Sequence, residues 1–361
     1  MNATPALPAT MKAALLLGHG GYDKLSYRDD VPVPRPAPGW VLIKVGAAGI
    51  NNTDINTRLG WYAPANRGPT SEAAGAGTGD EAGGGWSGGI AFPRIQGADV
   101  CGRIVALGAG VQPGRLGERV LVQPCLRSLA KGGIAPWLGS EYDGGFAEYV
   151  AAPAADSYRI ESGLSDAELA SFPCAYGTAE NLLTSLSVGP GERVLITGAS
   201  GGVGSAAVQL TRRRGAEAIA VAGADKAEAL RRLGAGRVLE RGASLVEGLG
   251  RDSMDAVVDV VGGPQWGQLL EVLKPGGRYA VSGAIAGPIV ELDLRQLYLK
   301  DLSLFGCTAQ REGVFRNLIG YIERGEIKPL LARTCPLAEI VAAQQEFLSK
   351  RHVGKLVLTV A

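Results

Sequence analysis

The sequence is poor in the residues that most often hold transition metals. It has two histidines among 361 residues, His19 near one end and His352 near the other. The five cysteines lack the paired spacing of a zinc site or a disulfide framework; they are Cys101, Cys125, Cys174, Cys307 and Cys335. The simplest expectation for them is reduced thiols, and with these a cytoplasmic protein.

An excess of charge of one sign and long apolar runs are also missing. The formal net charge is +1, which gives no electrostatic argument for nucleic acid or an anionic membrane as a partner. No apolar run is long enough to span a bilayer, and residues 1–10 lack the basic start and apolar stretch of a signal peptide. Hydrophobic residues make up 46% of the chain and charged residues 20%, which is typical of a globular protein. The length favours two domains.

The first part of the chain predicts short strands and turns. Apolar strand-like runs occupy 40–45, 104–107 and 119–122. The prolines that alternate over 32–38 indicate an extended segment. Residues 66–89 are mostly glycine, alanine, serine and acidic residues, so we expect a flexible insertion there.

From about residue 161 helical patterns alternate with apolar strands. The expected strands are 193–196, 218–221, 256–261 and 278–281, and the expected helices between them are 205–214, 225–233 and 265–273. This alternation predicts an α/β fold with a doubly wound parallel sheet, buried on both faces. The tail predicts helices at 314–324 and 337–348 and a strand at 355–358, and we expect it to return to the first domain.

A glycine-rich turn is the most informative segment. The strand at 194–197 runs into Gly198-Ala199-Ser200-Gly201-Gly202-Val203-Gly204, and a helical pattern follows from Ser205. Glycine lets phosphate oxygens approach the backbone, and a helix start supplies free N–H groups and a partial positive charge. We therefore expect a dinucleotide at this turn, in contact with Ser200, Gly201, Gly202, Val203 and Gly204. The alternative is a glycine-rich turn that binds nothing.

Several motifs together resemble those of one superfamily. They are 49–54 (GINNTD), 60–64 (GWYAP), 144–149 (GGFAEY), 176–179 (YGTA), the glycine-rich turn and 273–277 (LKPGG). In this order they resemble the medium-chain dehydrogenase/reductase superfamily, in its zinc-free quinone oxidoreductase and enoyl reductase branch. The resemblance implies a GroES-like β-rich catalytic domain at 1–160 and 308–361, and a Rossmann NADP-binding domain at 161–307. It also implies a cleft between them and a homodimer joined through the Rossmann sheets.

The ligands of the superfamily's zinc alcohol dehydrogenases are not found at the matching positions. Asn51 stands at the first ligand position, and the Gly-His-Glu motif appears as Gly97-Ala98-Asp99. The loop that would hold a structural zinc offers only Cys125. Asp99, Cys101 and Cys174 are better explained as small buried residues than as ligands. The sequence therefore predicts no metal.

Without a metal, alcohol oxidation lacks its usual Lewis acid, whereas reduction of an activated double bond needs only donors and a proton. The sequence thus predicts an NADPH-dependent oxidoreductase that transfers hydride to a quinone or an activated C=C bond of a small carbonyl compound. Two alternatives are kept: a zinc-type alcohol dehydrogenase-like enzyme, and a non-catalytic NADPH-binding relative with a structural or RNA-binding role.

Three residues are candidates for the chemistry. Tyr62 matches a tyrosine that follows the Asn-x-x-Asp motif in the branch; its phenol could donate to a substrate carbonyl and relay a proton, or it could be a packing aromatic. By resemblance Asn51 points at the nicotinamide and substrate, and a turn-stabilising asparagine is the alternative. Asp54 is a third candidate, although a capping carboxylate that orders this loop is favoured over a role in proton transfer.

Other positions are expected beside the cofactor. Thr178 is expected at the start of a helix, where it matches a residue that contacts the nicotinamide; a helix N-cap is the alternative. The remaining candidates lie at the ends of parallel strands, where such sheets bind ligands; they are Val261, Gly262, Ser282, Gly283, Phe305, Gly306 and Cys307. Their alternative is simply strand ends and turns.

The second Rossmann strand predicts NADP rather than NAD. It ends Val221-Ala222-Gly223-Ala224, without the acid that binds the ribose hydroxyls of NAD. A small residue at Gly223, followed by Lys226 and later by Arg241, suits a 2′-phosphate. Solvated surface charges are the alternative for these two cations.

Overall fold

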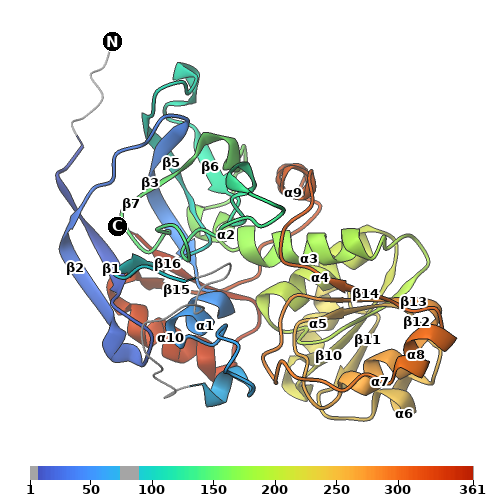
Figure 1. Ribbon diagram of the computed structural model, residues 1–361. Coiled ribbons are helices and arrows are strands. Elements are labelled where there is room, and N and C mark those ends of the chain that lie inside the picture. Colours follow the sequence, from blue (N-terminus) through green and yellow to red (C-terminus); the bar gives the residue numbers. More distant parts are fainter. Residues whose placement is uncertain (1–6, 74–88, 361) are drawn as a thin grey trace.

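The computed structural model describes residues 7–73 and 89–360. It has a β-rich domain and an α/β domain side by side (Figure 1). Residues 74–88, the larger part of the insertion expected at 66–89, lie outside the described residues. Across the described part of the chain, no helix is long and apolar enough to cross a membrane.

The β-rich domain contains two sheets. A larger sheet has the order β15-β16-β3-β5-β6-β8, with β7 paired to β3, and a smaller one has the order β2-β1-β4. The strand bounds are β1 Thr10–Leu16, β2 Leu25–Pro32, β3 Trp40–Gly49, β4 Arg94–Ile95, β5 Cys101–Leu107, β6 Arg119–Val122, β7 Tyr149–Pro153, β8 Ser157–Arg159, β15 Leu331–Pro336 and β16 Lys355–Thr359. Every pairing in these sheets is antiparallel except β15 with β16.

The α/β domain is a parallel sheet with the order β11-β10-β9-β12-β13-β14. Its strands are β9 Arg193–Ile196, β10 Glu217–Ala222, β11 Arg237–Glu240, β12 Met254–Asp259, β13 Leu273–Val281 and β14 Ser303–Gly306. All neighbouring strands are parallel. The order reverses between β9 and β12, which makes this a Rossmann sheet and confirms the predicted fold class.

Helices cover both faces of this sheet, as the apolar strands predict. In β9, Val194 and Ile196 pack with residues of α3 and α4, whereas Leu195 packs with residues of α6 and α7. The helices of the described residues are α1 Asn52–Arg58, α2 Asp166–Leu169, α3 Pro173–Ser185, α4 Gly202–Arg213, α5 Ala227–Leu233, α6 Leu245–Leu249, α7 Trp266–Glu271, α8 Leu294–Leu299, α9 Val314–Glu323 and α10 Ile340–Ser349.

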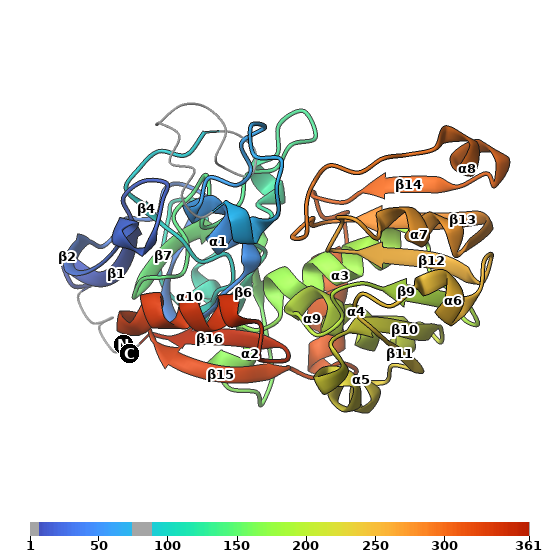
Figure 2. The ribbon, with the colours of Figure 1, turned by 90° about the horizontal axis from the view of Figure 1, so that it is seen from below.

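The tail crosses back from one domain to the other. Helix α9 packs against α3 through Phe315 and Leu318 and so covers the Rossmann side. Strand β16 then pairs with β3 of the β-rich domain. The packing therefore favours a return to the β-rich domain at β15 rather than at residue 308. The carboxyl ends of the parallel strands point toward the β-rich domain (Figure 2).

Candidate active site

Helix α1 presents two of the three catalytic candidates. Sequence reasoning treats the segment after Asn51 as a loop, whereas the structure forms a short helix with Asn51 as its N-cap residue. Asp54 Oδ2 accepts the Asn51 backbone N–H at 2.7 Å, and Asp54 Oδ1 accepts the Gly97 N–H at 3.3 Å. Burial raises the pKa of Asp54 to about 7. The geometry is that of a capping carboxylate that also ties α1 to the segment before β5.

Tyr62 follows α1 and lies near Asp54 and Cys174. Its phenol is hydrogen-bonded to the side chains of Thr53 and Asn56. Burial raises the pKa of Tyr62 above its ordinary value, more than these bonds lower it. The phenol therefore keeps its proton at neutral pH and remains a hydrogen-bond donor.

The side-chain amide of Asn51 is held from both ends. Its Nδ2 donates to Asp99 Oδ2 at 2.8 Å, and its Oδ1 accepts from the buried ammonium of Lys355. A carboxylate only accepts and an ammonium only donates, so these partners fix which end of the amide is which. The second Nδ2 hydrogen has only a long contact, 3.3 Å, to Gly49 O.

The donor set around Asn51 does not fit a zinc ion. Asp99 Oδ2 lies 2.8 Å from Lys355 Nζ, and burial raises the pKa of the Cys174 thiol, which favours its neutral form. A group of three or more His, Cys, Asp or Glu side chains that could hold a metal is not found in residues 7–73 and 89–360. His19 lies at the opposite end of α1 from Asn51, with Nδ1 against Thr57 O at 2.8 Å.

The glycine-rich turn is tight at Gly204 and open at Gly201. Gly198 has φ +56°, and α4 begins at Gly202. A Cβ at Gly204 would lie 2.3 Å from Gly198 O, so a side chain there would push the turn apart. A Cβ at Gly201 would meet nothing nearer than Gly198 O at 3.5 Å, which leaves open space at the helix start. These features fit a bound pyrophosphate.

Gly223 directly follows β10, and Lys226 comes three residues later. Lys226 donates to the carbonyl of Arg351 and pairs with Asp225 at 2.9 Å. Arg241 follows β11 and is exposed. Lys226 therefore already has two partners, while Arg241 is open to solvent on the same edge of the sheet.

The other predicted cofactor residues lie at the carboxyl ends of β12, β13 and β14, except Thr178. The N–H groups of Val261 and Gly262 both donate to Asp259 Oδ1, at 2.9 and 3.2 Å, so this carboxylate orders their turn. Ser282 and Gly283 follow β13, and Phe305 and Gly306 end β14.

The structure adds detail for two of these predictions, Cys307 and Thr178, and corrects the second. Cys307 is buried, with its thiol toward Ser185 of α3, so its side chain packs in the core. Thr178 does not start a helix: α3 begins at Pro173, and Thr178 lies in its second turn, hydrogen-bonded to the Cys174 thiol. Proline at the first helical position is the sequence signal that gives this start.

Sequence reasoning missed the loop that precedes β16. The Gly354 N–H donates to Ser200 O at 3.1 Å, which brings this loop onto the glycine-rich turn. Burial and the neighbouring Lys350 and Lys226 lower the pKa of His352. The basic run 350–352, shortly before Gly354 and Lys355, was the available signal, and the sequence analysis gave it no role.

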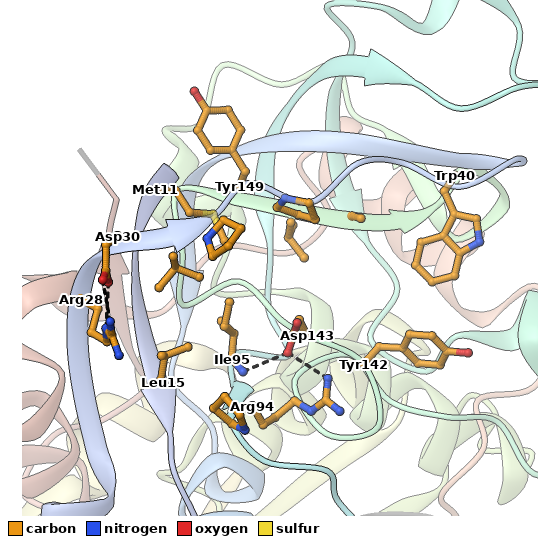
Figure 3. A pocket seen from close by; sticks show the side chains of 16 residues that line it. Met11, Leu15, Arg28, Asp30, Trp40, Arg94, Ile95, Tyr142, Asp143 and Tyr149 are labelled. Carbon is orange, nitrogen blue, oxygen red and sulfur yellow. Dashed lines mark hydrogen bonds and ion pairs between the residues drawn. The ribbon is translucent and has the colours of Figure 1, made fainter. Parts of the chain in front are cut away.

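A cavity of about 530 Å³ lies elsewhere, among β1, β2, β3 and β7 of the β-rich domain (Figure 3). Trp40, Tyr142 and Tyr149 line it, together with an ion pair of 2.9 Å between Arg94 and Asp143. None of the predicted site residues lines this cavity. It is therefore separate from the candidate site.

Family models match both domains. Residues 37–162 match the alcohol dehydrogenase GroES-like domain, and residues 202–324 match the zinc-binding dehydrogenase family. The first match covers most of the β-rich domain. The second covers the Rossmann domain from the start of α4.

Individual relatives match over nearly the whole chain. A solved structure from Sinorhizobium meliloti 1021, which carries the provisional name alcohol dehydrogenase, is 45% identical, with a TM-score of 0.87 and 98% of each chain covered. An acryloyl-coenzyme A reductase from Metallosphaera sedula is 28% identical over 97% of this chain and 100% of the relative. A quinone oxidoreductase from Rattus norvegicus is 27% identical over 96% of this chain and 97% of the relative.

Proposed function

We propose that this chain, which belongs to the medium-chain dehydrogenase/reductase superfamily in its quinone oxidoreductase and enoyl reductase branch, reduces quinones or activated C=C bonds with NADPH and without zinc. Relatives that match nearly the whole chain support its assignment as an oxidoreductase. The observation that carries the finer proposal is the surroundings of Asn51, where an ammonium and a carboxylate hold a neutral amide. This arrangement supplies hydrogen bonds but no Lewis acid.

The chemistry needs few groups from the protein. A bound nicotinamide supplies the hydride. As hydride reaches an electron-poor carbon, negative charge grows on the carbonyl oxygen of the acceptor, and a neutral donor stabilises it. The Tyr62 phenol, protonated at neutral pH, is the donor that we assign to this oxygen. Asn51 is the N-cap residue of the helix that precedes Tyr62, and the Asp54 carboxylate holds the start of that helix.

The cofactor would lie across the carboxyl edge of the Rossmann sheet. The start of α4 and the open space at Gly201 suit its pyrophosphate. The ends of β12, β13 and β14 suit the nicotinamide half, with Gly306 leaving open space beside it. Lys226 and Arg241 at the other end suit a 2′-phosphate.

Preference for NADPH is the first expected result. We expect kcat/KM to be at least about ten-fold higher with NADPH than with NADH, because a charged hydrogen bond to the 2′-phosphate contributes about 1.5–3 kcal/mol. Arg241→Ala should lower this ratio about ten-fold, because it lowers kcat/KM with NADPH and leaves kcat/KM with NADH unchanged. Arg251→Ala, at an exposed arginine paired with Glu271 before β12, is the matched control. Equal kcat/KM values for the two cofactors in the wild type would contradict the preference.

Metal independence is the second expected result. Purified protein should contain far less than one zinc per chain by elemental analysis. Its oxidation of NADPH should depend on added quinone or enone and should be unchanged after dialysis against a chelator. Stoichiometric zinc whose removal abolishes turnover would overturn this part of the proposal.

A second candidate function is favoured by one observation. The Sinorhizobium meliloti relative at 45% identity carries an alcohol dehydrogenase name. Oxidation of saturated alcohols by the metal-free protein would support that candidate. NADPH binding without turnover of any acceptor would support the non-catalytic alternative.

An exposed apolar surface supports the proposed homodimer. Strand β14 is an edge strand of the Rossmann sheet, and Leu304 on it is exposed. Leu294, Tyr298 and Leu299 of the neighbouring α8 are more than 60% exposed. Contiguous apolar side chains of this kind are typical of a subunit contact, and an open strand edge can pair with a second copy.

A further inference from the structure

A buried lysine lies at the centre of the candidate site. The side chain of Lys355 on β16 is 4% exposed, and its partner Asp99 is 0% exposed. Lys355 Nζ is 2.8 Å from Asp99 Oδ2 and 2.8 Å from Ile50 O, and it also donates to Asn51 Oδ1. An ammonium has three N–H donors. All three are engaged with the protein, so this lysine has none left for a substrate.

Two of the three acceptors around Lys355 belong to Asn51 and Asp99, which are positions considered above for metal ligands. Asn51 stands at the first ligand position, and Asp99, Cys101 and Cys174 were the remaining candidates. Asp99 bonds the ammonium with one oxygen and accepts the Cys174 backbone N–H with the other. A divalent cation would meet the charge of Lys355 at the same carboxylate. The ammonium of Lys355 therefore already supplies a positive charge at this site.

Lys355 also touches the cofactor turn. A Cβ at Gly202 would lie 2.8 Å from Lys355 Cδ, so its aliphatic stem packs against the start of α4. The preceding residue, Gly354, donates to Ser200 O. One side chain thus contacts both the turn expected to bind phosphate and the amide of Asn51.

We propose that Lys355, paired with Asp99, is a positioning residue that takes the place of a metal ion: it fixes the Asn51 amide and sets α1 against the cofactor turn. The two partners hold the amide in one orientation. Its remaining N–H has only the long contact of 3.3 Å to Gly49 O, and it is the donor that the amide has left for a cofactor or substrate. This inference rests on the proposed function only for the identity of the substrate.

The test compares three variants of the full chain with the wild type. Lys355→Met keeps an apolar stem of similar length and removes the charge. Lys355→Met combined with Asp99→Asn also removes the unpaired buried carboxylate, which is the main cause of instability when one partner is lost. Lys274→Met removes a lysine from another Asp pair, Lys274 with Asp255 at 2.6 Å, and serves as the matched control.

We expect Lys355→Met to lower kcat about 10- to 100-fold, because a small misplacement of a positioning group costs this much. It should also lower Tm by about 5 °C or more. In the double variant most of the Tm should return while kcat stays at least about ten-fold low, with the Kd of NADPH within about three-fold of wild type. The Lys274→Met variant should keep the wild-type kcat.

Two outcomes would overturn the inference. A kcat that recovers together with Tm in the double variant would make Lys355 a structural residue only. A single variant with wild-type kcat would remove it from the site altogether. Wild-type turnover reports on the proposed function, whereas the ratio of variant to wild type, taken on whichever substrate is turned over, reports on Lys355. The two proposals therefore fail separately.

Discussion

Replacing Tyr62 with phenylalanine is expected to lower kcat for an enone about 100-fold, which is typical for loss of a positioned proton donor. Burial keeps the phenol protonated, and the side chains of Thr53 and Asn56 hold it in place. Phenylalanine keeps the ring, including its edge contact with Trp61 at 5.6 Å between centroids, and removes only the hydroxyl. The Kd of NADPH should stay within about two-fold, because no cofactor role is assigned to this group.

Steady-state kinetics and a fluorescence titration with NADPH measure these two quantities. Tyr27→Phe, at an exposed tyrosine of β2, removes a hydroxyl far from the site and is the control. If Tyr62→Phe turns over the enone at the wild-type rate, Tyr62 is a packing aromatic and has no part in the mechanism.

Replacing Gly204 with alanine is expected to destabilise the cofactor-free protein by about 3 kcal/mol, since an added methyl in a packed site forces the backbone to move. Its Cβ would lie 2.3 Å from Gly198 O and 2.5 Å from Ala199 Cα. Both contacts are with backbone atoms of the same tight turn, so no flexible side chain can give way. The displaced turn should also lose most of its affinity for NADPH.

Gly201→Ala is the matched variant for this experiment. Its φ of −78° suits any residue, and its Cβ meets only Gly198 O at 3.5 Å. We therefore expect an unchanged Tm without cofactor and a weaker Kd for NADPH, because the methyl enters the space assigned to the phosphates. Equal effects of the two variants on Tm would contradict the close approach at Gly204. An unchanged Kd in Gly201→Ala would contradict a phosphate at this turn.

The parallel sheet could be predicted because the residues that indicate each strand are neighbours in the sequence. Strands such as 194–196 are continuous apolar runs, which only burial on both faces explains. The glycine-rich turn was likewise predictable, because a close approach between backbone atoms requires glycine, and the glycines are visible in the sequence. Helix α1 was missed, since its seven residues are rich in Asn, Asp and Thr and have no apolar periodicity. Asn51 and Asp54, with the spacing of a capping box, were the signal present.

Lys355 could not have been found in the same way. A lysine at the start of a predicted strand is expected in solvent. Its burial depends on Asp99, which is 256 residues away in the sequence, and on the carbonyl of Ile50. The charge is acceptable in the core only because the fold brings these acceptors together. The sequence alone thus predicted that the ligands of a metal are missing. The three-dimensional contacts were needed to find that the Lys355 ammonium supplies a positive charge in their place.

The position of the transferred hydride tests the central claim most directly. Metal-free protein would be given NADPH with deuterium at the transferable position and an α,β-unsaturated ketone, and the product would be analysed by NMR. We predict a saturated ketone with deuterium on the β-carbon, which is the product of conjugate reduction. An allylic alcohol with deuterium on the former carbonyl carbon would contradict the account and identify the protein as a carbonyl or alcohol dehydrogenase.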